Sequence, residues 1–161
     1  MTEQNGTATR APGQAQVMGG QKVVNRIVSV LLRTPGVSSG IGRRLVIITV
    51  TGRKTGKRYS VPVAYTRHDG ALLVGTPFAW ARNMRTGEPV EVVLQGRRRQ
   101  ADVQVISDED GVIAAYDTIC RDNRAFAKFN NVSIGPDGAP SPGDLHQAWA
   151  GGARAYRLSP R

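Results

Sequence analysis

One stretch, residues 45–65, constrains the fold of this chain more than any other. Its first part, Leu45–Thr51, is β-branched and apolar, which is typical of a buried strand. In its last part, Tyr59–Tyr65, every second residue is apolar or aromatic, so one face of a second strand is expected to be buried. Between them, Gly52–Arg58 holds two glycines and four cations. The stretch therefore predicts a β-hairpin with a cationic turn. Pro62 cannot donate a ladder hydrogen bond, so the second strand should lie at a sheet edge or carry a bulge.

The cationic turn has two interpretations. Glycine permits positive φ, so backbone N–H groups could turn inward and form a nest for a phosphate or a carboxylate. A glycine-rich basic hairpin is equally typical of a solvated turn. The turn is not a nucleotide-binding P-loop, because only three residues separate Gly52 from Gly56 and because Arg58, not Ser or Thr, follows Lys57.

Four further segments have the pattern of strands. Asp69-Gly70 is typical of a tight hairpin turn and precedes a third strand, so the first three strands are expected to form an antiparallel meander. The later strands predicted are Ala71–Thr76, Val90–Leu94, Ala101–Val105 and Ala153–Leu158. The total is about six antiparallel strands without βαβ alternation, so the fold class expected is mainly β with flanking helices, arranged as a small barrel.

Short helices are predicted between the last strands. Ser107 is expected to cap a helix that runs towards Cys120, with acidic residues in its first turn. Residues 124–132 predict a second helical segment that carries Phe126 and Phe129 on a common face. A third short helix is expected after Asp144.

The N-terminal part of the chain divides into two segments. Residues 1–17 lack apolar periodicity and predict a disordered tail. Gln21–Arg33 has apolar residues at helical spacing and predicts an amphipathic helix with a basic polar face. This helix either packs on its own domain or rests on a membrane surface. Residues 18–161 are expected to form a single domain that includes this helix, because their length suits one core.

Composition narrows the classes of partner. The net charge of +10 and the pI of about 10.8 indicate an acidic partner, such as nucleic acid, an anionic membrane surface or a polyanionic small molecule. Nucleic acid is not expected, because aromatics make up only 6% of the chain and RNA-binding motifs are absent. His68 and His146 lie far apart without metal-ligand spacing, so no metal site is predicted. A single cysteine and no apolar run of ~20 residues favour a cytoplasmic protein, with membrane association through Gln21–Arg33 left open.

Several residues, taken together, resemble the deazaflavin-dependent nitroreductase and quinone reductase family. The resemblance covers roughly residues 45–105. It rests on the Thr51–Arg58 turn followed by Pro62, Tyr65, Asp69-Gly70, Trp80 and Asn83. It implies a split β-barrel, the roll shared with FMN-binding relatives of pyridoxamine phosphate oxidase.

The resemblance also implies a function and a set of site residues. The function is transfer of a hydride from reduced coenzyme F-420 to a quinone, nitro or other conjugated acceptor. F-420 is an 8-hydroxy-5-deazaflavin with a phosphate and a glutamate tail, and FMN is the alternative cofactor. The implied cofactor-binding residues are Arg53, Lys54, Thr55 and Arg58 around the phosphate, Pro62, Gly75 and Thr76 at the ring, and Trp80 and Asn83 beside it. The implied substrate residues are Tyr65, Phe126 and Phe129. No catalytic residue is implied, since hydride transfer belongs to the cofactor.

Two other functions stay open at this point. The loop before Trp80 is shorter than the family pattern, which would suit a non-catalytic barrel that holds a cofactor, a lipid or a haem-like ligand. The net charge would suit a basic nucleic-acid-binding module. The resemblance allows either a monomer or a homodimer.

Overall fold

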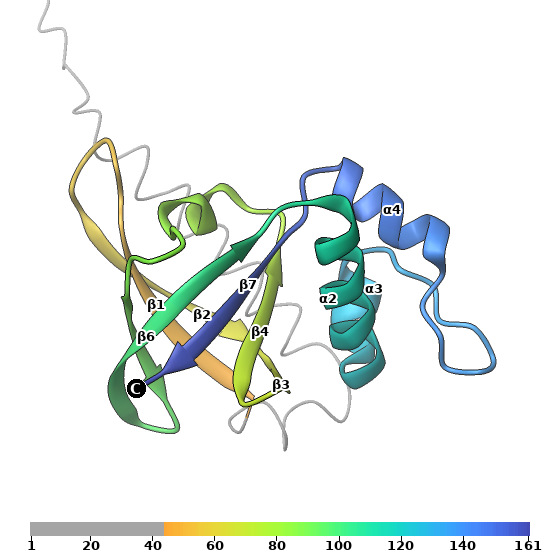
Figure 1. Cartoon of the computed structure of the whole chain (residues 1–161), viewed down its shortest axis with the longest axis horizontal. Helices are drawn as coiled ribbons and strands as arrows, with labels where there is room; N and C mark the ends of the chain where they lie inside the picture. Colours follow the sequence, from red (N-terminus) through yellow and green to blue (C-terminus); the bar gives the residue numbers. More distant parts are fainter. Residues whose placement is uncertain (1–43) are drawn as a thin grey trace, which may run out of the picture.

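The computed structural model describes residues 44–161 (Figure 1); the predicted tail, residues 1–17, and the predicted helix Gln21–Arg33 lie outside them. The described part is a seven-stranded antiparallel sheet with three α-helices and one 3₁₀ helix. In chain order the elements are β1 (Leu45–Thr51), β2 (Arg58–Ala64), β3 (Thr66–His68), β4 (Ala71–Thr76), η2 (Ala79–Asn83), β5 (Val90–Leu94), β6 (Arg97–Ile106), α2 (Glu109–Asp122), α3 (Arg124–Phe129), α4 (Pro142–Ala150) and β7 (Arg154–Pro160).

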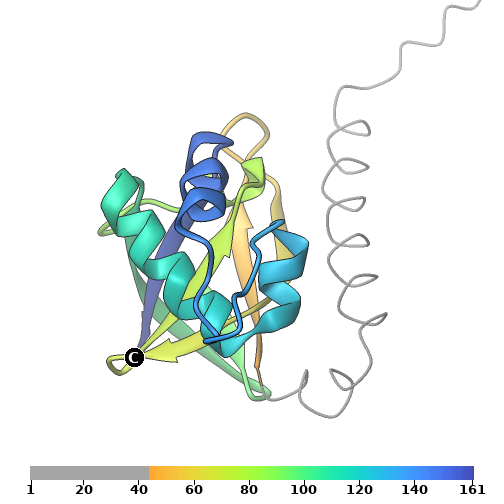
Figure 2. The ribbon, with the colours of Figure 1, turned by 90° about the vertical axis from the view of Figure 1, so that its right-hand side faces the viewer.

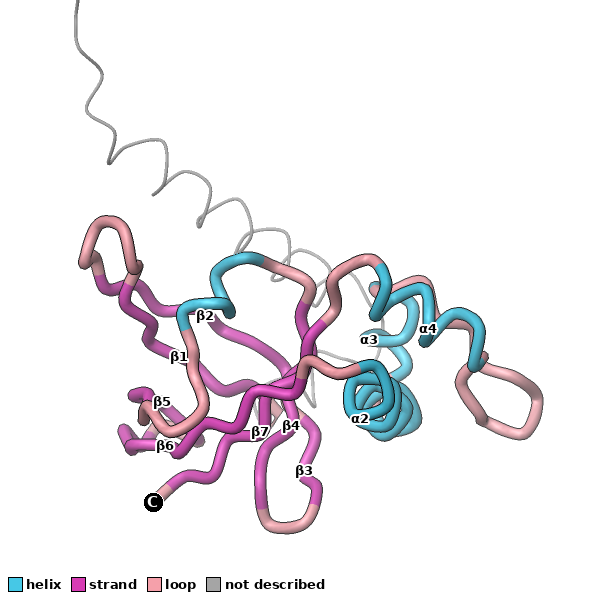
Figure 3. Tube along the Cα trace, turned by 45° about the horizontal axis from the view of Figure 1, so that its top comes forward, coloured by secondary structure: helices cyan, strands magenta, loops and turns pink. Residues whose placement is uncertain are grey.

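The order of the strands explains why the sheet curls. The order is β2-β1-β5-β6-β7-β4-β3, so β2 and β3 lie at its two ends. In the chain, however, only Tyr65 separates β2 from β3. The sheet must therefore roll until its ends approach each other, and Figure 3 shows the strands wrapped in this way. The backbone N–H of Tyr65 donates a hydrogen bond to the carbonyl of Arg44 at 2.9 Å, just before β1. The predicted mainly β, split-barrel fold is confirmed.

Two details of the predicted sheet were wrong. The sheet has seven strands, not six, because Thr66–His68 forms a separate short strand that pairs with β4. The first three predicted strands do not form a meander, since β2 pairs with β1 while β4 pairs with β3 and β7. Both differences follow from the crossing at Tyr65, which carries the chain from one end of the sheet to the other.

Two local predictions for the sheet are confirmed. The turn between β3 and β4 has positive φ at both Asp69 (47°) and Gly70 (73°), as a two-residue type I′ hairpin turn requires. Pro62 lies on the edge strand β2, opposite Ile47, so its missing N–H costs no bond to a second neighbour.

The core has two parts, one on each face of the sheet. Inside the barrel, alternate residues of the strands pack together and exclude water, among them Val46, Ile48, Val61 and Leu158. Outside it, α2 packs on β4 and β7, and α3 and α4 pack against α2, on the side that faces the viewer in Figure 2. Together they bury a second cluster around Tyr116. Within residues 44–161, no helix is both long enough and apolar enough to cross a membrane.

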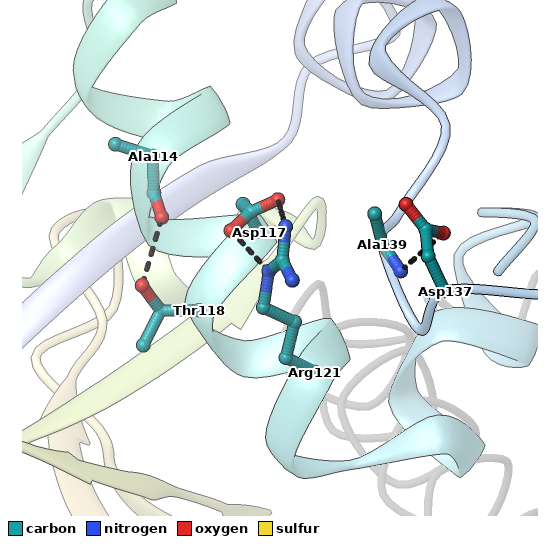
Figure 4. Close-up of polar contacts among 6 residues, drawn as sticks. All are labelled: Ala114, Asp117, Thr118, Arg121, Asp137 and Ala139. Carbon is teal, nitrogen blue, oxygen red and sulfur yellow. Dashed lines mark hydrogen bonds and ion pairs between the residues drawn. The ribbon is translucent and has the colours of Figure 1, made fainter. Parts of the chain in front are cut away.

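Helix α2 starts one residue later than the predicted cap implies. Its N-cap is Asp108, not Ser107, and the Asp108 carboxylate accepts a hydrogen bond from the backbone N–H of Gly111 at 2.9 Å. Ser and Asp cap helices about equally well, so the sequence could not choose between neighbours. On the solvent side of α2, Arg121 Nε contacts Asp117 Oδ2 at 2.8 Å, one turn apart (Figure 4).

Candidate functional site: a cationic cleft and an apolar groove joined by η2

In the turn of the β1–β2 hairpin, the N–H groups of both glycines form hydrogen bonds within the turn itself. The N–H of Gly52 donates to the carbonyl of Lys57 at 2.9 Å, and the N–H of Gly56 donates to the carbonyl of Gly52 at 2.8 Å. Only Gly56 has a positive φ, 66°. Of the two interpretations of the turn, an anion nest therefore does not hold for the amides of Gly52 and Gly56. The side chains of Arg53 and Lys54 are exposed, so these cations are what the turn offers to an anion.

Two hydrogen bonds tie this hairpin to the short helix η2. The guanidinium of Arg53 donates to the backbone carbonyl of Arg82. The Nδ2 atom of Asn83 donates to the phenol oxygen of Tyr59, on β2, at 2.8 Å. The same Nδ2 atom donates to the carbonyl of Trp80 at 2.9 Å, within η2. The hairpin and η2 are thus held together at two points near the base of the cationic turn.

A cleft of about 670 Å³ opens beside these contacts. Its lining residues come from β1, the hairpin turn, the start of β2, the end of η2, the residues around the start of β5, and β6. They are Thr49, Val50, Thr51, Gly52, Arg53, Gly56, Arg58, Asn83, Arg85, Glu88, Pro89, Val90, Glu91 and Gln100.

The cations of the cleft are not equally available to a ligand. Glu91 forms two ion pairs: its Oε2 lies 3.5 Å from Nη2 of Arg58, and its Oε1 lies 3.5 Å from Nη1 of Arg98. The Glu91 side chain is only 20% exposed. Arg58 is therefore partly neutralised from within the protein. Neither Arg53 nor Arg85 forms an ion pair among residues 44–161. These two guanidinium groups are the better anion donors of the cleft.

A second, apolar cavity, called the groove below, includes Phe78, which immediately precedes η2. It is lined by Val63, Ala64, Gly75, Thr76, Pro77, Phe78, Asn123, Ala125, Phe126 and Phe129. The rings of Phe78 and Phe129 have centroids 6.1 Å apart and are tilted by 59°. The hydroxyl oxygen of buried Thr76 accepts a hydrogen bond from the N–H of Phe78 at 3.1 Å, which fixes the backbone just before η2. Phe78, just before η2, lines the groove, and Asn83, at the end of η2, lines the cationic cleft, so four residues of chain separate them.

Gly75 is required at the floor of this groove for steric reasons. A Cβ atom added to Gly75 would lie 2.7 Å from Cζ of Phe126 and 2.8 Å from Cε2 of Tyr116. These two rings pack edge-on with centroids 5.1 Å apart, so they cannot both retreat easily. We expect Gly75→Ala to lower the free energy of unfolding by about 1–3 kcal/mol through overpacking, measured by urea denaturation.

A matched glycine serves as the control for that measurement. Gly143 lies in α4, and an added Cβ would meet no atom closer than 3.9 Å. Gly143→Ala should leave stability unchanged or raise it slightly, since Ala favours helix. Equal stability of the two variants would show that the Phe126 and Tyr116 rings tolerate a methyl group.

The twelve site residues predicted from the sequence fall into three groups. Arg53, Arg58 and Asn83 line the cationic cleft. Gly75, Thr76, Phe126 and Phe129 line the apolar groove. The remaining five line neither cavity: Lys54, Thr55, Pro62, Tyr65 and Trp80.

Trp80 and Tyr65 belong to the core inside the barrel. Trp80 is 6% exposed, and its Nε1 has no hydrogen-bond partner among the described residues. Tyr65 is 4% exposed, with the guanidinium of Arg67 5.6 Å from its ring centroid. Trp80 affects the cleft only indirectly: its backbone carbonyl accepts a hydrogen bond from the side chain of Asn83, which lines the cleft.

The sequence did not single out Phe78, Arg85 or Glu91, which line these cavities, or Tyr59, which lines neither but is hydrogen-bonded to Asn83. Glu91 reaches the cleft because Thr49 of β1 pairs with it across the sheet, forty-two positions along the chain. Such a pairing leaves no local signal. Tyr59 did have one, since it alternates with Val61 and Val63 beside the cationic turn, but that pattern marks burial and not ligand contact.

Solved structures of several proteins are similar to this chain. A conserved hypothetical protein from Mycobacterium tuberculosis is 10% identical, with 99% of this chain and 86% of that chain covered and a TM-score of 0.49. An FMN-binding protein related to pyridoxamine 5'-phosphate oxidase, from Nostoc punctiforme, is 14% identical, with 94% and 82% covered and a TM-score of 0.45. A putative 5-nitroimidazole antibiotic resistance protein from Bacteroides thetaiotaomicron is 15% identical, with 84% and 78% covered and a TM-score of 0.42.

The family of the chain comes from a different comparison. No curated protein matches the sequence. A family model described as F420H(2)-dependent quinone reductase matches residues 9–129, which is well over half of the chain. This match confirms the resemblance found in the sequence, including its assignment to a reductase that depends on reduced F-420. The chain belongs to the F420H(2)-dependent quinone reductase family.

Proposed function

We propose that this protein binds coenzyme F-420 across η2 and transfers a hydride from its reduced form to a quinone or another small conjugated acceptor. The observation that carries the proposal is the pairing of a cationic cleft with an apolar, aromatic groove at the two ends of one short helix. A coenzyme with a flat ring at one end and anionic groups at the other matches both parts.

The donors available in the cleft suit the anionic part of F-420. Arg53 and Arg85 line the cleft without an acid partner among the described residues, and exposed Lys54 lies next to Arg53 in the turn. Guanidinium groups bind phosphate and carboxylate oxygens through charge-assisted hydrogen bonds. The hydroxyl of Thr51 adds a neutral donor to the same cleft, whereas that of Thr49 is hydrogen-bonded to Ser60 across the sheet.

The groove suits the conjugated ring and the acceptor. Phe78, Phe126 and Phe129 present aromatic surface there, and Gly75 lets the ring of Phe126 lie close against β4. Aromatic side chains bind flat conjugated molecules by stacking and edge contacts. We assign Phe126 and Phe129 to the acceptor side, and Gly75 and Thr76 to the ring side.

The protein contributes binding and orientation, and bound F-420 supplies the hydride. Reduction of a quinone to a hydroquinone takes this hydride and one proton, and the proton comes from solvent. The apolar groove keeps water away from the acceptor face.

A binding titration followed by turnover tests this function. Purified protein is titrated with F-420 and, in parallel, with FMN, with intrinsic tryptophan fluorescence as the signal. We expect micromolar or tighter binding of F-420, weaker binding of FMN, and oxidation of reduced F-420 when a water-soluble naphthoquinone is added. Preference for FMN would reject the deazaflavin. Tight F-420 binding without turnover on quinones or nitro compounds would favour the non-catalytic barrel.

A further inference from the structure

The phenol of Tyr59 has an unusual hydrogen-bonding position. Its oxygen lies 2.8 Å from Nδ2 of Asn83. An amide can present either its oxygen or its NH₂ group to a phenol, and the two choices leave opposite roles for the phenol hydrogen.

The neighbouring carbonyl of Trp80 decides the orientation of this amide. That carbonyl lies 2.9 Å from the same Nδ2 atom and can only accept a hydrogen bond. The group of Asn83 that faces it must therefore be the NH₂ group, which has two hydrogens. One hydrogen goes to Trp80 and the other to Tyr59, so the phenol oxygen of Tyr59 is an acceptor in this contact.

The hydrogen of the Tyr59 phenol is consequently left for another acceptor. No acceptor for it is found among residues 44–161. Burial raises the pKa of Tyr59 above its usual value, and the hydrogen bond from Asn83 offsets only part of this increase. The phenol therefore keeps its hydrogen at neutral pH and is a neutral donor.

Tyr59 stands between two residues that line the cationic cleft. Its ring lies against Gly52, where an added Cβ would be 3.9 Å from Cε1 of the ring. Its oxygen is bound to Asn83. Gly52 and Asn83 both line the cleft, as does Arg53, whose guanidinium has no acid partner among residues 44–161.

We propose that Tyr59 donates its phenol hydrogen to the phosphate of F-420 in the cationic cleft, and that Asn83 is the residue that positions this phenol. The inference rests on the proposed function, because it takes the anion in the cleft to be the phosphate of F-420. The Tyr59 phenol would add a neutral hydrogen-bond donor to a cleft whose other binding groups are mainly cations. It would therefore strengthen phosphate binding without adding charge to the cleft.

The test compares F-420 binding by the unmodified protein, Tyr59→Phe and Ser60→Ala. Tyr59→Phe removes only the phenol oxygen and keeps the ring against Gly52. Ser60→Ala is the matched control, since it removes a hydroxyl from the next residue of β2, where that hydroxyl contacts Thr49 at 3.0 Å across the sheet. We expect Tyr59→Phe to raise the Kd for F-420 by about tenfold, as for loss of a hydrogen bond to a charged group. Ser60→Ala should leave the Kd unchanged.

A second readout separates a phosphate contact from a merely structural role. The ³¹P resonance of bound F-420 should move between the unmodified protein and Tyr59→Phe, and should not move in Ser60→Ala. An unchanged Kd, or a weaker Kd with an unmoved ³¹P resonance, would overturn the inference while leaving F-420 as the cofactor. Failure of the unmodified protein to bind F-420 would instead reject the proposed function itself.

Discussion

Replacing Arg53 and Lys54 together by alanine should weaken F-420 binding by at least about a hundredfold, since two charge-assisted contacts to an anion are lost. Arg53 lines the cleft, and Lys54 follows it in the exposed turn. Neither side chain contributes to the core, so the fold should persist. The measurement is the Kd for F-420 by tryptophan fluorescence. The loss should shrink at high salt, because exposed charges are screened there.

The control for this pair removes the same amount of charge elsewhere. Arg97 and Arg99 lie in the first part of β6, opposite Leu94 and Val92 of β5, and line neither cavity. Alanine at both positions should change the Kd by less than about threefold, through the general field of the protein alone. If the two double variants bind F-420 equally weakly, only net charge matters and the cleft is not a specific site. If both bind as the unmodified protein does, the phosphate lies elsewhere.

The local parts of this fold could be predicted from the sequence. The β1–β2 hairpin, the turn at Asp69 and the edge position of Pro62 each depend on residues that are close together in the chain. In each case backbone conformation decides the outcome: β-branched residues extend the chain, Asp-Gly accepts positive φ, and proline lacks a donor. These causes act over a few residues, so a sequence pattern is enough.

The order of the strands could not be predicted in the same way. Nothing in the sequence around Tyr65 indicates that the chain crosses there from one end of the sheet to the other. The pairing of β4 with β7 joins residues more than seventy positions apart, and it is stabilised by packing inside the barrel. Short, similar apolar strands can pair in several orders, and only the whole core selects one.

The candidate site has the same division. Arg53 and Asn83 came from a motif, whereas Glu91 enters the cleft through the pairing of β1 with β5. That pairing also makes Arg58 a weaker candidate for phosphate binding than the sequence predicted. In the structure it faces Glu91, so its charge is shared with an internal partner before any ligand arrives.

Alkaline pH should destabilise the protein through its buried cysteine. Cys120, on the inner face of α2, is fully buried in the cluster around Tyr116. Burial raises the pKa of its thiol to about 12, and the negative charge of Asp117 adds to the increase. In the unfolded chain the same thiol ionises near its ordinary value of 9.0. Above that pH the unfolded state therefore binds fewer protons than the folded state. Stability is fully present below pH 9 and should fall by about 1.4 kcal/mol per pH unit above it.

The pH window identifies the group responsible. Burial also raises the pKa of Tyr116, whose hydroxyl has no partner among the described residues, but tyrosine ionises in the unfolded chain only near 10.0. Between pH 9 and 10, ionisation of the cysteine should thus dominate the loss of stability.

Urea denaturation of the unmodified protein and Cys120→Ala across this window isolates the contribution of the thiol. The alanine variant should be less stable at pH 7, and its stability should fall less steeply with pH. Tyr116→Phe is the control, because it should keep the slope between pH 9 and 10 and reduce it only above 10. Parallel slopes for the unmodified protein and Cys120→Ala would mean that the thiol ionises equally readily in both states, which a fully buried sulfur beside Asp117 cannot do without opening α2.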